Sequence, residues 1–503
     1  MSKGINDNKD VLEKLDSLSD QIEDNDKPIA IILAAGHGKR IKSERSKMMH
    51  EIWGVPTVVR VANSAAKGLE SENQVIVVGI KAEEVARAAG KADHRTFVLQ
   101  KEQKGTGDAT RAALLALDSC KHIRDLYILP GDMGLITADI LATFRKSFEI
   151  SNCGMKILTG VYRGEPDANT YGRIIRVPTK DTEGNQSGDD YGKVIEIKEH
   201  KDILAIPDGY SYVVEYNGRK YSFPKEQLLR IKEYNTGIYA VKYDLLKKHI
   251  SDITSDNVQG ELYLTDIINI FNQNHIAVGA DPVDDDNAVI GFNVKSVLKE
   301  MDSIYRRKVY KQLRDIIVIE DEDDFFIADE VVEQILELDK QYPSLDIFLQ
   351  KGVHLSKGVK LNRGVSIWTN TNIRGNVEIG EGAIIQDNVS IRTYPHQHLR
   401  IGNNCIIMRG DIIKGNLTIG DNTRIESGVN ITGSDEYPTL IGNNVTIKGT
   451  TYIFGSVIED DLFIEHSVLK CKKVERTLKK DGTIQPVRWV MPQPQGLDII
   501  SDI

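Results

Sequence analysis

The C-terminal part of the chain carries a six-residue repeat, and this repeat constrains the fold more than any other feature. Between about residues 352 and 470, an aliphatic residue recurs every six positions, with small or polar residues between; Ile379, Ile385 and Ile391 keep this spacing. A hexapeptide period sustained over about a hundred residues is typical of a β-helix, whose aliphatic residues point inward and stack on their equivalents in neighbouring coils. We therefore expect a left-handed parallel β-helix of hexapeptide repeats.

The repeat has interruptions and clear limits. It breaks at 393–400 and 432–440 and then resumes, so we expect loops there that project from the solenoid. We place the β-helix at 352–471 and a C-terminal tail at 472–503. The acidic stretch before the repeat, 311–351, is predicted to be a linker with helical content.

The region from residue 28 to 310 follows a different pattern. Short apolar runs at 29–36, 74–80, 96–100 and 125–132 alternate with helical stretches. Buried strands alternating with helices indicate an α/β domain built on a parallel sheet, and such sheets bind ligands at the carboxyl ends of their strands. The expected fold class is thus α/β, a Rossmann-like domain followed by the β-helix.

Three further segments are predicted from their patterns. Residues 1–27 are charged with a weak helical period, so we expect an exposed N-terminal extension containing a helix that could pack on a neighbour. Two polar stretches, 178–192 and 203–230, resemble insertions or long loops. The second predicts a β-hairpin, because Asn217-Gly218 is a favoured two-residue turn.

Composition excludes several classes of protein. The formal charge is −10, from 64 basic and 74 acidic residues, which argues against a general nucleic-acid binder. Four scattered cysteines are too few for a disulfide framework or a zinc cluster. No apolar run reaches about 18 residues and no signal peptide is evident, so we expect a cytoplasmic protein without membrane contact.

One segment carries the chemistry of a phosphate site. LAAGHGKRIKSERSKMMHEIWGVP (33–56) places small residues after a predicted strand, so backbone N–H groups can approach phosphate oxygens. It also supplies the cations Lys39, Arg40 and Lys47. A glycine-rich turn alone is weak evidence, but here the strand, the Gly36-x-Gly38 pair and the cations occur together.

This segment resembles the signature of the sugar-nucleotide pyrophosphorylases. It is most similar to the N-terminal half of the bifunctional N-acetylglucosamine-1-phosphate uridylyltransferase/glucosamine-1-phosphate acetyltransferase family. The resemblance covers residues 28–310 well, whereas the C-terminal half matches in architecture only. Further blocks follow in the family order: LQKEQKGTGDA (99–109), LPGDMGLI (129–136), TYGRIIR (170–176), KVIEIKEHKD (193–202), EYNTGIYAV (233–241), NVQGELYLTDII (257–268) and, more loosely, IGFNVK (290–295).

The resemblance implies a role for each matching residue. Arg40 and Lys47 would be catalytic, Arg40 on the departing pyrophosphate and Lys47 near the α-phosphate. Asp132 would bind Mg²⁺, with Asn293 as a second ligand or sugar contact. The remaining implied contacts are Leu33, Ala34, Ala35, Gly36, Gln100, Gly105, Thr106 and Gly131 for the nucleotide, and Gly172, Glu199, Asn235 and Asn293 for the sugar.

Three departures from the family pattern do not remove a charged group. Lys39 stands where the family usually has Thr, and Ser46 where it has Pro before the lysine. Asn293 is flanked by Phe292 and Val294, whereas the family pattern in this segment is G-V-N-N. The extra lysine adds a cation near the expected triphosphate.

The implied reaction is transfer of UMP from UTP to N-acetylglucosamine-1-phosphate with release of pyrophosphate, which makes UDP-N-acetylglucosamine for cell-wall synthesis. Such a transfer needs positioning and charge neutralisation more than a protein nucleophile. Another sugar-1-phosphate, with UTP or dTTP, stays open as an alternative substrate.

The β-helix departs from the family more than the α/β domain does. The acetyltransferase half of the family requires R-x-R-P-G and N-Y-D-G segments, and IRTYPHQHLRIG (391–402) and ITGSDEYPTLIG (431–442) lack them. His396 and His398 are interpreted as residues of a solvent-exposed loop, with a relic of the acetyltransferase site or a metal site as the alternatives. We expect a homotrimer assembled through the β-helix, with an acetyl-CoA-dependent acyltransferase as the alternative.

Overall fold

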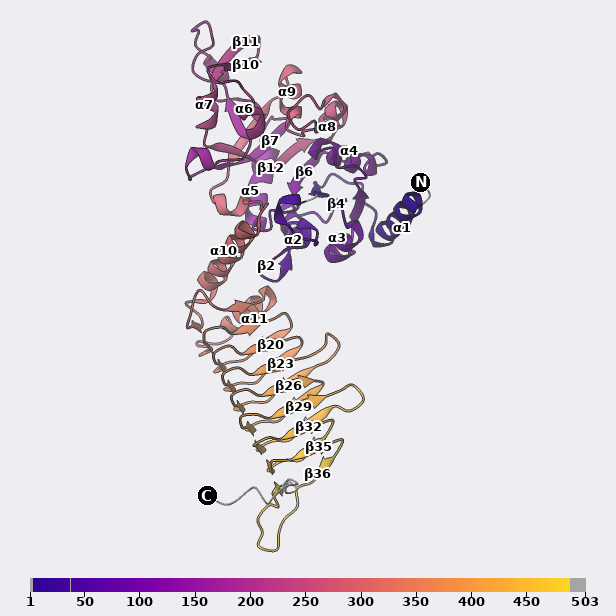
Figure 1. Ribbon diagram of the computed structural model, residues 1–503, viewed down its shortest axis with the longest axis vertical. Coiled ribbons are helices and arrows are strands. Elements are labelled where there is room, and N and C mark those ends of the chain that lie inside the picture. The colour runs from indigo at the N-terminus through magenta and orange to yellow at the C-terminus, as the bar shows by residue number, and fades with distance from the viewer. Residues whose placement is uncertain (1–2, 37, 489–503) are drawn as a thin grey trace, which may run out of the picture. The chain divides into compact units, whose positions relative to one another are not determined.

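The computed structural model describes residues 3–36 and 38–488. The chain divides into two compact units, Met1–Asp302 and Ser303–Ile503 (Figure 1). Each unit has its own sheets, and the two are described separately below. Helix α10 (Lys295–Leu313) spans the boundary in the sequence.

The first unit is built on one mixed sheet. Its central strands β6, β1, β4 and β5 are parallel neighbours, and they coincide with the four apolar runs in the sequence. All five residues of β4 are buried, as expected for a strand covered on both faces. The strands in spatial order are β13 (Val278–Pro282), β7 (Met155–Val161), β12 (Glu233–Lys242), β6 (Asp125–Pro130), β1 (Ile29–Ala34), β4 (Gln74–Val78) and β5 (Arg95–Leu99).

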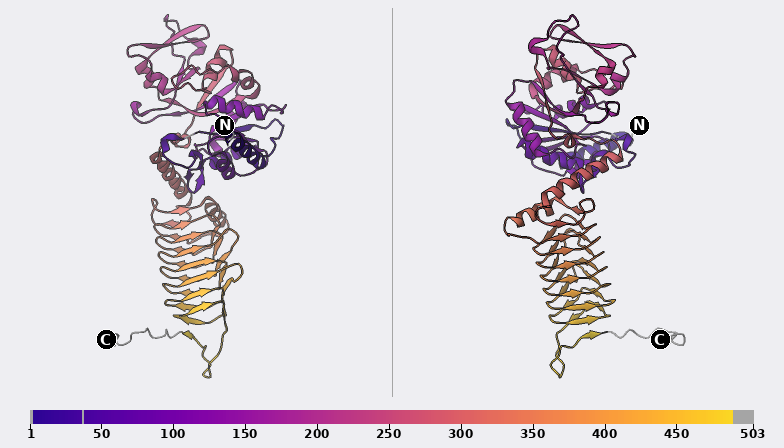
Figure 2. Two further views of the ribbon diagram at one scale, coloured as in Figure 1. Left: turned by 45° about the vertical axis from the view of Figure 1, so that its right-hand side comes forward. Right: turned by 90° about the vertical axis from the view of Figure 1, so that its left-hand side faces the viewer.

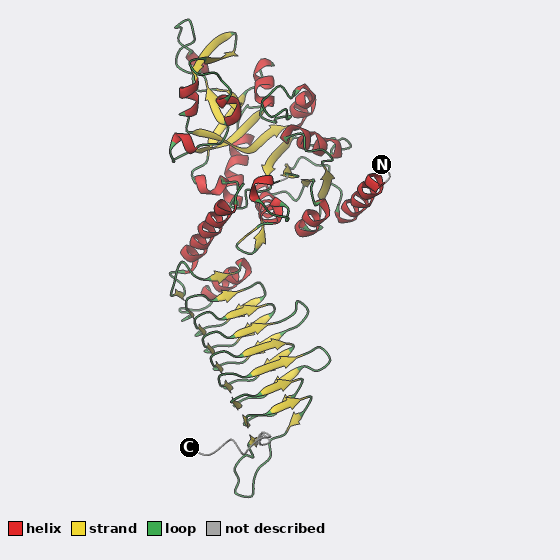
Figure 3. Cartoon of the chain, viewed as in Figure 1, coloured by secondary structure: helices red, strands yellow, loops and turns green. Residues whose placement is uncertain are grey.

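Helices cover both faces of this sheet and confirm the predicted α/β class (Figure 3). One core cluster packs α2, α3 and α5 against the sheet through residues such as Val61 and Phe144, and a second packs α4, α8 and α9 through residues such as Ala113 and Phe271. The helices are α2 (Thr57–Leu69), α3 (Ala82–Ala89), α4 (Thr106–Ala116), α5 (Ala138–Glu149), α8 (Tyr243–His249) and α9 (Asp266–Gln273).

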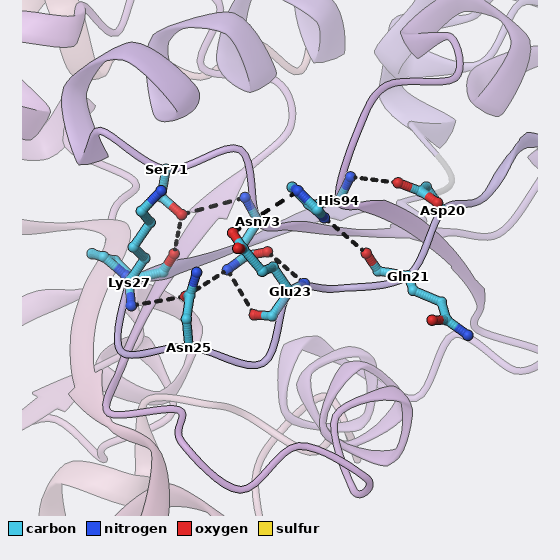
Figure 4. A network of polar contacts seen from close by, with 9 residues as sticks. Asp20, Gln21, Glu23, Asn25, Lys27, Ser71, Asn73 and His94 are labelled. Carbon is cyan, nitrogen blue, oxygen red and sulfur yellow. Dashed lines mark hydrogen bonds and ion pairs between the residues drawn. The ribbon is translucent and has the colours of Figure 1, made fainter.

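The N-terminal segment is a helix, but it differs from the exposed extension that the sequence suggested. Helix α1 (Lys3–Leu18) inserts Leu15, which is 1% exposed, into the core of the α/β unit. The residues after α1 run past the amino ends of the strands of the central sheet. Asp20 accepts from the N–H of His94 before β5, and Asn73 before β4 accepts from the N–H of Glu23 (Figure 4). Asp24 accepts from two N–H groups before β6.

The two polar stretches form a small subdomain on the α/β unit. The predicted hairpin is confirmed: β10 (Ser211–Tyr216) pairs with β11 (Arg219–Pro224) through the Asn217-Gly218 turn, where both residues have positive φ. Its buried core contains Tyr221, Phe223 and Leu228 together with apolar residues of nearby strands and helices. The elements beside the hairpin are β8 (Arg173–Arg176), β9 (Val194–Lys198), α6 (His200–Leu204) and α7 (Lys225–Leu229).

The second unit is a parallel β-helix, as the hexapeptide period predicts (Figure 2). Short strands stack into three sheets, and the repeat residues lie in register: Ile367, Ile385, Ile407 and Ile425 form one fully buried column. The first sheet holds β14 (Val318–Ile319), β16 (Phe348–Leu349), β19 (Ser366–Ile367), β22 (Ile384–Ile385), β25 (Ile406–Ile407), β28 (Arg424–Ile425), β31 (Thr446–Lys448), β34 (Phe463–Glu465) and β37 (Val487–Arg488). The second holds β15 (Phe326–Ile327), β17 (His354–Leu355), β20 (Asn372–Arg374), β23 (Ser390–Arg392), β26 (Ile412–Gly415), β29 (Asn430–Gly433), β32 (Tyr452–Phe454) and β35 (Val468–Lys470). The third holds β18 (Val359–Leu361), β21 (Val377–Ile379), β24 (Leu399–Ile401), β27 (Leu417–Ile419), β30 (Thr439–Ile441), β33 (Val457–Ile458) and β36 (Lys473–Val474).

The solenoid extends beyond the repeat at both ends. The stretch expected to be a linker contains strands β14 and β15 and helix α11 (Asp329–Asp339). The two strands pair in register with β16 and β17, so they belong to the first coils of the solenoid. Strands β36 and β37 lie in the expected tail. Residues 489–503 of that tail lie outside the described residues. The two interruptions form loops between β23 and β24 and between β29 and β30, as predicted.

No helix among the described residues is both long and apolar enough to cross a membrane.

Candidate active site

The loop after β1 brings Lys47 back toward the ends of the strands. Two short 3-10 turns, Lys39–Ile41 and Lys47–Met49, follow the small residues 34–36. Gly38 has φ +58°, and a Cβ there would lie 2.9 Å from Cβ of Lys47, so glycine lets the loop fold over the lysine. Arg40 is exposed on this loop, whereas Lys47 is buried.

Lys47, Asp132 and Asn293 come together although they are far apart in the sequence. Lys47 Nζ lies 2.5 Å from Asp132 Oδ2 and donates to Asn293 Oδ1 at 3.0 Å. The ring of Phe292 lies 5.4 Å from the same ammonium, which adds a cation–π contact. The Lys47 and Asp132 side chains are 10% and 14% exposed, so this pair has lost most of its water.

Backbone packing holds Asp132 at the carboxyl end of β6. The N–H of Gly131 donates to the carbonyl of Leu33 at 2.9 Å, which joins the ends of β6 and β1. A Cβ on Gly131 would lie 3.1 Å from that oxygen, and one on Gly291 would lie 3.2 Å from Asp132 Oδ2. Small residues therefore let three chain segments converge on one carboxylate.

The segment proposed to read the base forms a tight loop between β5 and α4. Gln100 is buried and donates through Nε2 to the carbonyl of Gly105 and to Asp108 Oδ2, so its Oε1 is the group that can accept from a base N–H. Gly105 has φ +112°, and a Cβ there would strike the carbonyl of Leu262. Thr106 is fixed as well, because its hydroxyl accepts from the N–H of Leu264.

Gly172, Asn235 and Glu199 form a second cluster, as the predicted sugar site requires. The N–H of Asn235 donates to the carbonyl of Gly172 at 2.9 Å. A Cβ on Gly172 would lie 3.1 Å from Glu199 Oε1, so glycine is what lets the carboxylate approach. The Asn235 side chain accepts from the Tyr239 hydroxyl and lies where a bulge interrupts the pairing of β12 with β7.

The electrostatics of Glu199 differ from those of a surface carboxylate. Burial, reinforced by the nearby carboxylates of Asp202 and Asp266, raises the pKa of Glu199 to about 7. Burial likewise raises the pKa of Asp266 to about 6. A carboxyl that is partly protonated near neutral pH can donate as well as accept, which suits recognition of hydroxyl and amide groups.

Comparisons with known proteins agree with this geometry. Residues 30–185 match the MobA-like NTP transferase domain. The chain is 33% identical over 283 residues to the bifunctional protein GlmU of Desulfotalea psychrophila, an alignment that covers 56% of this chain and 71% of that protein. The chain belongs to the GlmU family. It is also 29% identical to the Shouchella clausii GlmU, over 72% of this chain and 65% of that relative.

The likeness to this family has limits in length. The chain spans less than two thirds of the first GlmU relatives it matches. Among solved structures, it is similar to a UDP-glucose pyrophosphorylase complexed with UDP-glucose, with a TM-score of 0.38 and 14% identity over 56% of this chain and 99% of that one. The matched domain model and the GlmU relatives, and not this structural likeness, establish a GlmU-like nucleotidyltransferase domain.

The donor set at Asp132 suits the Mg²⁺ expected of a GlmU-type nucleotidyltransferase. One carboxylate and one amide oxygen are hard donors, and Gly291 leaves open the space beside Asp132 that a Cβ would fill. No group of three or more His, Cys, Asp or Glu side chains suited to a metal occurs among the residues the structure describes. The protein would thus supply two oxygens, and substrate phosphates and water would complete the shell.

Sequence reasoning missed the residues that stiffen the sugar end of this GlmU-like site. Arg173 is fully buried and donates to the side chain and the carbonyl of Asn169, which fixes the turn before Gly172. Tyr171 stacks on Tyr234 with ring centroids 4.5 Å apart. Burial raises the pKa of Tyr171, and the charge of Asp132 raises it further, so Tyr171, which precedes Gly172 in the chain, is also within electrostatic reach of Asp132. The only sign of these residues in the sequence was that bulky side chains, Tyr171 and Arg173, flank Gly172.

His396 braces two loops of the β-helix. His396 Nε2 lies 2.8 Å from Asp435 Oδ2, and Gln397 donates to Asp435 Oδ1 at 2.9 Å. One carboxylate thereby ties the loop after β23 to the loop after β29. This contact agrees with the interpretation of His396 as a loop residue.

Proposed function

We propose that this protein is a UDP-N-acetylglucosamine diphosphorylase, which transfers UMP from UTP to N-acetylglucosamine-1-phosphate and releases pyrophosphate. The observation that carries the proposal is the convergence of Lys47, Asp132 and Asn293 at the ends of β1 and β6. The family likeness supports a sugar nucleotide as product, and the buried Glu199 beside Gly172 and Asn235 suits an N-acetylated sugar.

The proposed mechanism uses positioning and charge. The Gln100 loop holds the base, and the small residues 33–36 bring backbone N–H groups to the triphosphate. Mg²⁺, held by Asp132 and Asn293, would neutralise phosphate charge when bound. Lys47 would stabilise the α-phosphate during attack by the sugar phosphate, and Arg40 would stabilise the departing pyrophosphate. A protein nucleophile is not needed.

Pyrophosphate release from UTP, Mg²⁺ and N-acetylglucosamine-1-phosphate tests the proposal. The full-length protein should release pyrophosphate, and Lys47→Met should lower kcat at least about a hundredfold. Lys156→Met is the matched control, because Lys156 forms a similar ion pair with Asp281 away from the site. Turnover with glucose-1-phosphate or dTTP, but not with these substrates, would assign the enzyme to another sugar nucleotide. No pyrophosphate with any pair would refute the proposal.

We further propose that the protein works in the cytoplasm, as a homotrimer assembled through the β-helix. Sedimentation velocity of the full chain tests the oligomeric state, and a monomer at micromolar concentration would contradict it. An acyltransferase activity of the β-helix is the alternative role. Free thiol released from acetyl-CoA with glucosamine-1-phosphate would reveal it, and we expect none, because the chain lacks the R-x-R-P-G and N-Y-D-G segments at 391–402 and 431–442.

A further inference from the structure

The ammonium of Lys47 contacts both side chains that we assign to the divalent cation. Nζ lies 2.5 Å from Asp132 Oδ2 and 3.0 Å from Asn293 Oδ1. Its third partner is the face of Phe292. The two hard oxygen donors of the cluster therefore already interact with one positive charge, which the protein itself supplies.

A divalent cation at these oxygens would meet that charge at short range. The Lys47 and Asp132 side chains are only 10% and 14% exposed, so water screens their interactions poorly. Gly38 packs against the lysine stem, and this contact keeps Lys47 close to Asp132. An ammonium and a dication that share two oxygens in such a setting repel each other strongly.

We propose that Lys47 is a displaceable counter-ion of the metal site. Its ammonium neutralises Asp132 until a divalent cation takes the same oxygens, and it then turns to the phosphate that arrives with the cation. The inference rests on the proposed function for the identity of that phosphate. It deepens that function, because it makes one residue link metal binding to phosphate binding.

The proposal has a consequence for the order of binding. A free cation must displace the ammonium without offering it a new partner, so the free cation binds weakly. A cation bound to a nucleoside triphosphate brings the new partner along, so the complex binds well. The site would thus select the metal–nucleotide complex over either component alone.

Binding of Mn²⁺, followed by electron paramagnetic resonance on the full-length protein without nucleotide, tests this directly. Lys47→Met should tighten Mn²⁺ binding at least about tenfold. Adding Asp132→Asn to Lys47→Met should remove the gain. Lys156→Met is the matched control: it removes an ammonium 3.0 Å from Asp281 Oδ1 with a similarly buried lysine, and it should leave Mn²⁺ binding unchanged. Equal or weaker binding by Lys47→Met, including no binding by either protein, would overturn the proposal.

A second measurement uses the unmodified protein and does not depend on the folding of a variant. Reductive methylation, read by mass spectrometry, should modify Lys47 several times faster when Mn²⁺ is added, while the rate at Lys156 stays constant. An unchanged rate at Lys47 under saturating Mn²⁺ would also overturn it. Neither experiment contains UTP or a sugar phosphate. A failure of the pyrophosphate assay would therefore refute the proposed function and leave this inference standing.

Discussion

Asp411 should make the β-helix less stable as the pH rises. Its side chain is fully buried in the solenoid, where Oδ1 accepts from the N–H of Val429 at 2.8 Å. Oδ2 is buried without a hydrogen-bond partner. Burial raises the pKa of Asp411 to about 7, although backbone N–H groups of Val429, Gly428 and Met408 oppose the rise.

The sign of the pH effect on stability follows from the pKa of Asp411 in the folded protein and in the unfolded chain. The folded pKa of about 7 lies above the ordinary aspartate value of 3.8, so the folded protein holds the proton more tightly than the unfolded chain. The stabilisation is complete below pH 3.8 and is lost as the pH rises to 7. The pKa of Asp411 is about three pH units higher in the folded protein, and at 1.36 kcal/mol per unit the bound proton stabilises the fold by at most about 4 kcal/mol. Most of this stabilisation is lost between about pH 5 and 8.

Other coils show how this position works when it carries no charge. Thr371 and Thr451 occupy the equivalent turns, and each hydroxyl accepts from the next coil while donating to a nearby carbonyl. A threonine thus satisfies the position without a charge. Asp411→Thr and Asp411→Asn should both remove the pH dependence.

Urea unfolding of the full-length protein at pH 5 and pH 8 measures the effect. Asp411→Asn should be more stable than the unmodified protein at pH 8 by about 2–4 kcal/mol, and by clearly less at pH 5. Glu436→Gln is the control, because that side chain is exposed in the loop after β29. A stability difference that is the same at both pH values would refute the reasoning.

Three further predictions concern the α/β unit. Glu199→Gln should lower kcat/KM for the sugar phosphate about tenfold or more in steady-state kinetics and leave the KM for UTP unchanged; an equal loss for both substrates would contradict its place in the sugar cluster. Gly38→Ala combines a positive φ with a 2.9 Å clash and should lower both stability and kcat. The control is Gly90→Ala, at φ +74° with nothing within 4 Å, which should lower the free energy of urea unfolding by only about 1–2 kcal/mol and leave kcat unchanged. Leu15→Ala should cost about 2–4 kcal/mol, and Leu12→Ala, at 38% exposure on the same helix, less than about 0.5; similar costs would show that α1 is not anchored by Leu15.

The repeating and buried parts of the fold could be predicted because their signal is local. Each coil of the β-helix repeats one pattern, so Ile385 and Ile391 could be placed in the core from spacing alone. The strand β4 is apolar throughout because both of its faces are covered. The ends of the solenoid escaped prediction for the same reason, since Val318 and Val487 join the sheets through register with a neighbouring coil and lack the repeat.

The N-terminal segment shows a different limit. The charges of Asp20 and Asp24 suggested a solvated extension, but both carboxylates accept backbone N–H groups that precede strands of the sheet. A side chain that caps a distant loop has no periodic signature. A single apolar residue, Leu15, then fixes the helix to the core.

The same distinction explains what sequence could say about the site. The glycines, the lysine and the aspartate could be identified from their motifs, but their mutual distances depend on where the sheet ends its strands. Asn293 had the loosest match in the sequence, yet its amide oxygen lies 3.0 Å from Lys47 Nζ. Phe292, a departure from the family pattern, places its ring against the same ammonium. A substitution that weakened the sequence argument therefore contributes a contact to the cluster, and the physical reason is that an aromatic face can hold a cation without competing for the oxygens of Asp132.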